Sequence, residues 1–105
     1  MQINMILKAL SHPIRRDIIA RLRDGAMTAG DLAAAYDVSK PTMSTHFTSL
    51  KEADLIHAER DGVTIYYHLN ATVAEEAISA LMSLLGTGTQ PANQATPSTR
   101  KEIST

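Results

Sequence analysis

Residues 38–69 constrain the fold of this 105-residue chain more than any other segment. They predict one helix with a polar outer face, followed at once by a β-hairpin that turns at Asp61-Gly62. The two strands, residues 55–60 and 63–69, are rich in β-branched and aromatic residues. Asp-Gly suits a two-residue type I′ turn, because both central residues of that turn need positive φ. A hydroxyl-rich helix joined to a short ribbon is typical of a surface that binds nucleic acid.

The helix is predicted to start at Ser39 as its N-cap, with Pro41 in the first turn, where a missing N–H costs nothing. One side of the helix is predicted to face the core through Met43, Phe47 and Leu50. The other side is left with short hydroxyl groups, which can approach base edges and phosphates closely. The residues expected at the DNA surface are Lys40, Pro41, Thr42, Ser44, Thr45, His46, Ser49 and Arg60.

These residues have different expected roles. Contacts with base edges are assigned to Thr42, Ser44 and Thr45, and contacts with the sugar–phosphate backbone to Lys40, Ser49 and Arg60. His46 lies near the edge of the inward face, where it either orients a phosphate contact or simply packs. A helix rich in Ser and Thr, taken alone, is more often an ordinary solvated surface helix. The hairpin that follows it favours DNA binding instead.

Apolar periodicity predicts four more helices around this segment. Their approximate ranges are residues 3–10, 12–24, 28–36 and 72–85. Ser11 is the predicted N-cap of the second helix, and Thr28 that of the third. About three residues separate the third helix from the hydroxyl-rich one. That spacing fits a helix-turn-helix, in which the second helix enters the major groove.

The overall charge argues mildly against nucleic acid, since the net charge is −1 and the pI is about 6.4. Four arginines crowd residues 15–23, so we expect a local basic stripe and a modest grip on phosphate. Arg15 and Arg16 have two interpretations, contact with phosphate or ion pairs with Asp17 and other acids. The lack of cysteine excludes a disulfide framework and a thiolate metal site. With no membrane-length apolar run or signal-peptide pattern, we expect a cytoplasmic protein without membrane insertion.

Three segments carry a resemblance to a known family. They are LKALSHPIRRDIIARL (7–22), MTAGDLAAAYDVSKPTMSTHFTSLKEADLI (27–56) and ERDGVTIYYHLN (59–70). Together they resemble the ArsR/SmtB family of winged-helix repressors, and within it the SdpR-like branch. The resemblance implies a mainly α-helical winged helix-turn-helix fold, with four helices, a β-hairpin wing and a fifth helix. It also implies a homodimer formed through the first and last helices.

The expected function is that of a sequence-specific DNA-binding transcriptional regulator, a homodimeric (auto)repressor that binds a palindromic operator. A two-fold dimer would place two reading helices in successive major grooves of double-stranded DNA. The predicted dimer interface consists of Ile3, Ile6, Leu7, Leu10, Ala74, Ile78, Leu81, Met82 and Leu85. From the residues alone, these two apolar stripes suit a core within one chain equally well.

Many members of this family sense metals, but the residues that form the family's two usual metal sites are missing here. The third predicted helix has no cysteine, and the last helix offers only the adjacent Glu75 and Glu76, which point in different directions. We therefore expect no metal and no cofactor. A turn at Asp61-Gly62 sets His57 opposite residue 66 and diagonal to His68, on one face of the sheet. Two histidines without a carboxylate or thiol make a poor metal site, and such a pair is most often polar sheet surface.

Two alternatives to a DNA-binding repressor stay open. The near-neutral pI permits a winged-helix dimer that acts on a regulatory protein partner, and His57 with His68 permits a histidine-based metal sensor. An enzyme is not expected, because the sequence has no cysteine nucleophile and no glycine-rich phosphate loop. Residues 1–86 are expected to form the DNA-binding and dimerisation domain. Residues 87–105 are polar and expected to form a flexible tail.

Overall fold

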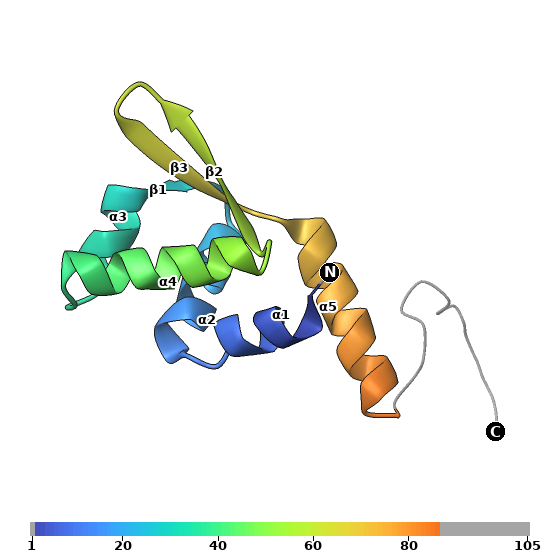
Figure 1. The fold of residues 1–105 in the computed structure, drawn as a ribbon. Coiled ribbons are helices and arrows are strands. Elements are labelled where there is room, and N and C mark those ends of the chain that lie inside the picture. Colours follow the sequence, from blue (N-terminus) through green and yellow to red (C-terminus); the bar gives the residue numbers. More distant parts are fainter. Residues whose placement is uncertain (1, 87–105) are drawn as a thin grey trace.

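The computed structural model describes residues 2–86, which form five helices and a small antiparallel sheet whose hairpin projects from one side of the helices (Figure 1). The elements are α1 (Ile3–Ala9), α2 (Pro13–Leu22), β1 (Met27–Thr28), α3 (Ala29–Ala34), α4 (Lys40–Glu52), β2 (Ile56–Asp61), β3 (Thr64–Leu69) and α5 (Ala71–Leu84). This is the predicted winged helix-turn-helix, in which α3 and α4 form the helix-turn-helix and the β2–β3 hairpin forms the wing. The tail predicted for residues 87–105 lies outside the described residues.

The strand β1 is the one element of the described chain that the sequence did not predict. The sheet has the order β1-β3-β2, and β1 pairs with the inner end of the wing through Met27 opposite Tyr67 and Thr28 opposite Tyr66. Thr28 also caps α3, because its Oγ1 accepts a hydrogen bond from the N–H of Asp31 at 3.0 Å. One residue therefore belongs to both the sheet and the start of the helix-turn-helix.

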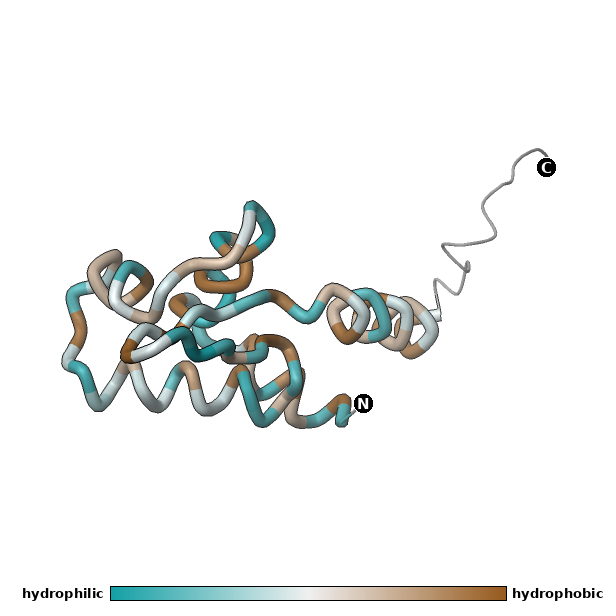
Figure 2. Tube along the Cα trace, turned by 90° about the horizontal axis from the view of Figure 1, so that it is seen from above, coloured by the Kyte–Doolittle hydropathy of each residue, from teal (hydrophilic) through white to brown (hydrophobic). Residues whose placement is uncertain are grey.

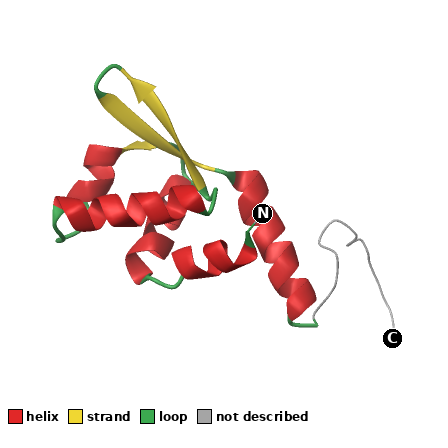
Figure 3. Ribbon diagram, viewed as in Figure 1, coloured by secondary structure: helices red, strands yellow, loops and turns green. Residues whose placement is uncertain are grey.

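The wing turns one residue later than predicted. Asp61 pairs with Thr64, so the central residues of the turn are Gly62 and Val63. Gly62 has φ +64°, whereas Val63 is not among the residues with positive φ, which is the pattern of a type II′ turn rather than type I′. His57 consequently lies opposite His68 and not opposite residue 66. The prediction that the two histidines share a sheet face is confirmed, but the predicted register is wrong by two residues. The hairpin extends beyond the helices (Figure 3).

The helix boundaries follow local capping chemistry. Ser39 caps α4 as predicted, since its Oγ accepts a hydrogen bond from the N–H of Thr42 at 3.3 Å. The predicted Ser11 cap of α2 is wrong, because the ring of His12 accepts the N–H of Ile14 at 3.1 Å instead. The Ser11 hydroxyl donates to the carbonyl of Lys8 and thereby completes the end of α1.

The end of α4 needs a left-handed residue, and that residue is Asp54 with φ +59°. The N–H of Leu55 donates to the carbonyl of Leu50 at 3.0 Å, and the N–H of Asp54 to that of Lys51 at 2.9 Å. These two bonds are those of a Schellman motif, whose left-handed position usually holds glycine. The motif turns the chain directly into β2 and buries Leu55.

The core lies between α4, the inner face of the wing and the first three helices. Phe47 of α4 stacks on Tyr67 of β3, with ring centroids 4.6 Å apart. As predicted, Met43, Phe47 and Leu50 are buried. Ile6 of α1 is completely buried as well. The expectation that Ile6 contacts a partner subunit is therefore wrong, because this side chain has no exposed surface left to offer.

The last helix, α5, projects from one side of the domain (Figure 2). It contacts α1, but of its residues only Ala77 is buried, while Ile78 is 55% exposed. Leu84 and Leu85, at its end, are 72% and 74% exposed. Within residues 2–86, no helix is long and apolar enough to span a membrane.

Candidate nucleic-acid interface

The exposed side of α4 is a polar surface of the helix-turn-helix. Pro41, Thr42, Ser44, Thr45 and Thr48 are all exposed, opposite the buried side chains that hold the helix against the core. Residues 40–49 contain no acidic side chain. A neutral helix surface with short side chains can approach a polyanion without charge repulsion, and its hydroxyls can bind base edges.

Two of these hydroxyls are already engaged within the helix. The Thr45 hydroxyl donates to the carbonyl of Pro41 at 3.1 Å, and the Oγ1 of Thr42 accepts a hydrogen bond from Ser39 at 2.9 Å. Thr45 has therefore committed its proton, so it offers its oxygen and its methyl group to a partner. Thr42 keeps its own hydroxyl proton to donate.

Lys40 is the first residue of α4 and lies beside backbone N–H groups of the first turn, which have no partner inside the helix. Its side chain is exposed, and among residues 2–86 it forms no ion pair. An ammonium group beside the positive end of a helix dipole is suited to a phosphate.

His46 is not on this surface, since its side chain is only 4% exposed. It therefore cannot touch DNA directly in this arrangement and does not belong to the exposed DNA surface, whereas burial is compatible with both of its predicted roles, orienting a phosphate contact and packing. Its Nδ1 accepts a hydrogen bond from Nε of Arg15 at 3.0 Å, and its ring lies 4.4 Å from that of His12. Burial lowers the pKa of His46 below its ordinary value, and the charges of His12 and Arg15 lower that pKa further. Because Nδ1 accepts the hydrogen bond from Arg15, the neutral form of the ring carries its proton on Nε2.

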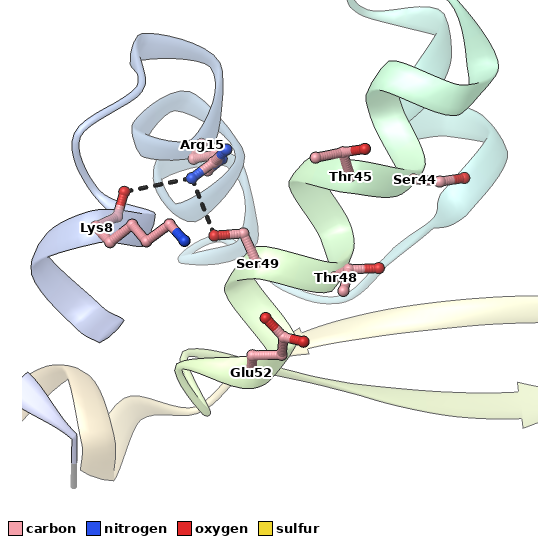
Figure 4. A pocket seen from close by; sticks show the side chains of 7 residues that line it. All are labelled: Lys8, Arg15, Ser44, Thr45, Thr48, Ser49 and Glu52. Atoms are coloured by element: carbon pink, nitrogen blue, oxygen red, sulfur yellow. Dashed lines mark hydrogen bonds between the residues drawn. The ribbon is translucent and has the colours of Figure 1, made fainter. Parts of the chain in front are cut away.

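The sequence left open whether Arg15 forms an ion pair or contacts phosphate, and within residues 2–86 it forms no ion pair. Its Nη1 donates to Oγ of Ser49 at 2.9 Å and to the carbonyl of Lys8 at 3.3 Å (Figure 4). Three elements, α1, α2 and α4, therefore meet at one guanidinium group. Ser49, expected to contact the DNA backbone, is half-buried and already holds this group.

The nearby acid Asp17 has other partners. It accepts hydrogen bonds from the Tyr36 hydroxyl and, at 2.9 Å, from Nε of Arg21. These hydrogen bonds lower the pKa of Asp17, with that from Tyr36 contributing most. Burial, together with the bond to Asp17, raises the pKa of Tyr36 to about 12. The cluster fastens α2 to the turn of the helix-turn-helix and leaves the Arg15 charge uncompensated.

The groove beside Arg15 runs along the exposed side of α4 and has a volume of about 310 Å³. Its walls are formed by Lys8, Arg15, Ser44, Thr45, Thr48, Ser49 and Glu52. Figure 4 shows Lys8 and Arg15 reaching toward Ser49 from one side, with Glu52 at one end of the groove. Sequence reasoning missed Lys8, because only the packing of α1 against α4 brings it to this place. It also missed Glu52, which lies on α4 itself, three residues after Ser49.

The wing carries Arg60 one residue pair away from its turn, opposite Ile65. The side chain is exposed and forms no ion pair within the described chain. At the tip itself Val63 is 96% exposed. Arg60 is thus free to reach a phosphate beside the wing, in keeping with its expected role.

The paired histidines lie on the outer face of the wing. The rings of His57 and His68 stack at 4.9 Å and 5°, and Nε2 of His68 lies 2.8 Å from Oε1 of Glu59. Stacked parallel rings do not direct their nitrogens toward a common point. Within residues 2–86, no group of three or more His, Cys, Asp or Glu side chains is arranged to hold a metal ion.

The predicted dimer residues fall into two sets. Leu7, Ile78 and Leu85 are exposed. Partial burial is found for Ile3, Leu10, Ala74, Leu81 and Met82. Apart from Ile6, every one of them retains some accessible surface, on two helices that touch each other.

Comparison with known proteins agrees with this architecture. The model of a helix-turn-helix domain family matches residues 10–59. The chain is 42% identical to the transcriptional repressor SdpR of Bacillus subtilis, over 81% of this chain and 94% of the relative. It is 33% identical to an arsenical resistance operon repressor of Staphylococcus aureus, over 85% of each chain.

Solved structures give the same result. The crystal structure of an ArsR family transcriptional regulator matches with a TM-score of 0.70 and 26% identity, over 83% of this chain and 91% of the other. The transcriptional repressor BigR from Xylella fastidiosa matches with a TM-score of 0.60 and 29% identity, over 78% and 84%. With its helix-turn-helix, its wing and these relatives, the chain belongs to the ArsR/SmtB family of winged-helix regulators and is a DNA-binding regulator of transcription.

Proposed function

We propose that this regulator is a homodimeric repressor that recognises a palindromic operator, including one at its own promoter, through α4. The observation that carries the proposal is the neutral, hydroxyl-bearing face of α4, with Lys40 at its start. In this arrangement Thr42, Ser44 and Thr45 read base edges, while Lys40 and Arg60 hold phosphates. The relatives named as repressors support repression rather than activation.

The dimer is supported by the exposed apolar residues of α5 and α1. A helix that stands clear of its own domain with Ile78 and Leu85 exposed gains stability when a second copy covers it. A two-fold axis through such an interface would present two α4 helices to half-sites about 34–36 Å apart, one turn of the duplex. The modest number of basic residues makes this doubling important, because one α4 makes few phosphate contacts.

The operator is to be identified by pulling down genomic DNA fragments with the purified protein. Fluorescence anisotropy then measures the affinity of the protein for a short duplex that contains the operator and for a duplex of random sequence. Thr45→Ala should weaken operator binding by about 1–3 kcal/mol while leaving random DNA nearly unaffected, since it removes a contact with a base. A loss of equal size on both duplexes would contradict the assignment of Thr45 to base reading.

Lys40→Ala should instead weaken both duplexes alike. It should also reduce the slope of log K against log salt by about one unit, because one fewer counterion is released. Arg23→Ala removes the same charge from the exposed end of α2 and serves as the matched control. If the two variants change the slope equally, Lys40 has no specific phosphate contact.

A further inference from the structure

The guanidinium of Arg15 carries a charge that no carboxylate within residues 2–86 neutralises. Its partners are the imidazole of His46, the hydroxyl of Ser49 and the carbonyl of Lys8, all of them neutral. These bonds use Nε and both protons of Nη1. Nη2 makes no hydrogen bond with another described residue, so two donors remain available for a ligand.

The groove beside this group has the chemistry of a phosphodiester site. Lys8 and Arg15 supply two positive charges, and Ser49 and Thr48 supply hydroxyls. The guanidinium offers a phosphodiester its positive charge and the two N–H donors of Nη2, which suffice for charge-assisted hydrogen bonds to a phosphate oxygen. The groove also shares Ser44 and Thr45 with the exposed reading face of α4 (Figure 4), so a duplex against that face brings its backbone past Arg15.

The buried side chain of His46 sets the position of the Arg15 guanidinium through a hydrogen bond. The imidazole is buried, accepts the Nε–H with Nδ1, and leaves its own Nε2 without a hydrogen-bond partner among the described residues. A buried polar atom without a partner lowers stability, so an apolar side chain would serve packing better at this place. The imidazole does provide what an apolar residue cannot, an acceptor that fixes the guanidinium before DNA arrives.

We propose that Arg15 binds a backbone phosphate of the operator in the groove between α1, α2 and α4, and that His46 is the positioning residue that orients it. The inference rests on the proposed operator binding and adds a phosphate contact behind the reading face. Glu52, at one end of the groove, opposes the phosphate and limits the affinity of this contact.

The test is fluorescence anisotropy of the full chain on its operator duplex over a range of salt concentrations, with melting temperatures measured in parallel. Arg15→Gln should weaken binding by about tenfold or more and reduce the salt slope by about one unit per subunit. Glu52→Gln should act in the opposite direction and strengthen binding, since it removes the repelling charge without touching the hydrogen bonds of Arg15. An unchanged salt slope for Arg15→Gln, or no gain for Glu52→Gln, would overturn the phosphate assignment.

The role of His46 is tested by two substitutions of different chemistry. His46→Leu removes the acceptor and should weaken binding several-fold, whereas His46→Asn keeps an acceptor oxygen near the position of Nδ1 and should restore most of it. In the Arg15→Gln background, His46→Leu should have no further effect on affinity, because the residue it positions is gone. Additive losses, or failure of Asn to restore binding in a variant that melts normally, would show that His46 has only a structural role.

These outcomes are distinguishable from failure of the proposed function. If the wild-type protein shows no preference for any genomic sequence, operator recognition itself is wrong. If the wild type binds its operator specifically and Arg15→Gln binds with the same salt slope, operator recognition stands and the Arg15 site is wrong.

Discussion

The exposed face of α5 allows the proposed dimer to be tested with one substitution, Ile78→Ala. Complete burial of an Ile side chain contributes about 1.5–3 kcal/mol. Because 55% of Ile78 is still exposed in the single chain, a partner can add about half of this, roughly 0.8–1.7 kcal/mol per copy. A two-fold interface contains the residue twice. The substitution should therefore weaken dimerisation by about 1.6–3.4 kcal/mol, or about 15- to 300-fold in Kd.

The measurement is sedimentation equilibrium over a dilution series, with circular dichroism to show that the subunit stays folded. Alanine is a better helix former than isoleucine, so α5 itself should not be weakened. Glu76→Ala is the matched control, since Glu76 is exposed two residues earlier, on roughly the opposite side of the helix. A dimer Kd that is unchanged in Ile78→Ala, or weakened equally in the control, refutes the assignment of this face to the interface.

Three further predictions concern stability. Asp54→Gly should raise the free energy of unfolding in urea by about 0.5–1 kcal/mol, because glycine accepts positive φ without steric cost; a loss would show that the Asp54 side chain contributes a favourable contact. Ser39→Ala should lower the same quantity by about 1 kcal/mol through loss of the α4 cap, and no change would argue against that cap. His46 has a folded pKa below its ordinary 6.5, so the unfolded chain binds its proton first. Stability should hence fall as pH drops below about 6.5 and level off below the folded pKa; a melting-temperature profile that His46→Asn leaves unchanged would contradict this.

The wing shows how much of a strand pairing can be predicted from the alternation of apolar and polar residues along the sequence. The predicted and observed pairings differ by two residues, and a shift of two keeps every side chain on the same face of the sheet. Burial of Tyr67 and exposure of His57 are therefore compatible with both registers. Gly62 occupies a turn position in either case, so local turn preference does not decide between them. The observed register also brings Tyr67 onto Phe47 and opposite Met27, contacts between residues far apart in the sequence.

The reading helix was predictable for a different reason. Its cap, its proline and its three predicted core residues are all local to residues 39–50, and they agree with one another. The contact between Arg15 and His46 joins residues 31 positions apart, and nothing in either segment specifies the other. Local chemistry thus predicted the five helices, the two strands of the wing and the neutral face of α4, but not β1. The groove beside that face depends on how α1 and α2 pack, and the sequence alone could not show it.

Thr28 belongs to β1 through its pairing with Tyr66 and to α3 through its cap, so the wing and the helix-turn-helix share a backbone segment. A displacement of the wing must therefore pull on the first turn of α3. These two parts, which we propose contact DNA, should move as one body, so little conformational entropy is left to be lost when they meet a duplex. The rate of binding to DNA should then be limited by diffusion and orientation rather than by folding of the wing. In hydrogen exchange, the backbone amides on both sides of Thr28 should exchange with solvent through a common opening event.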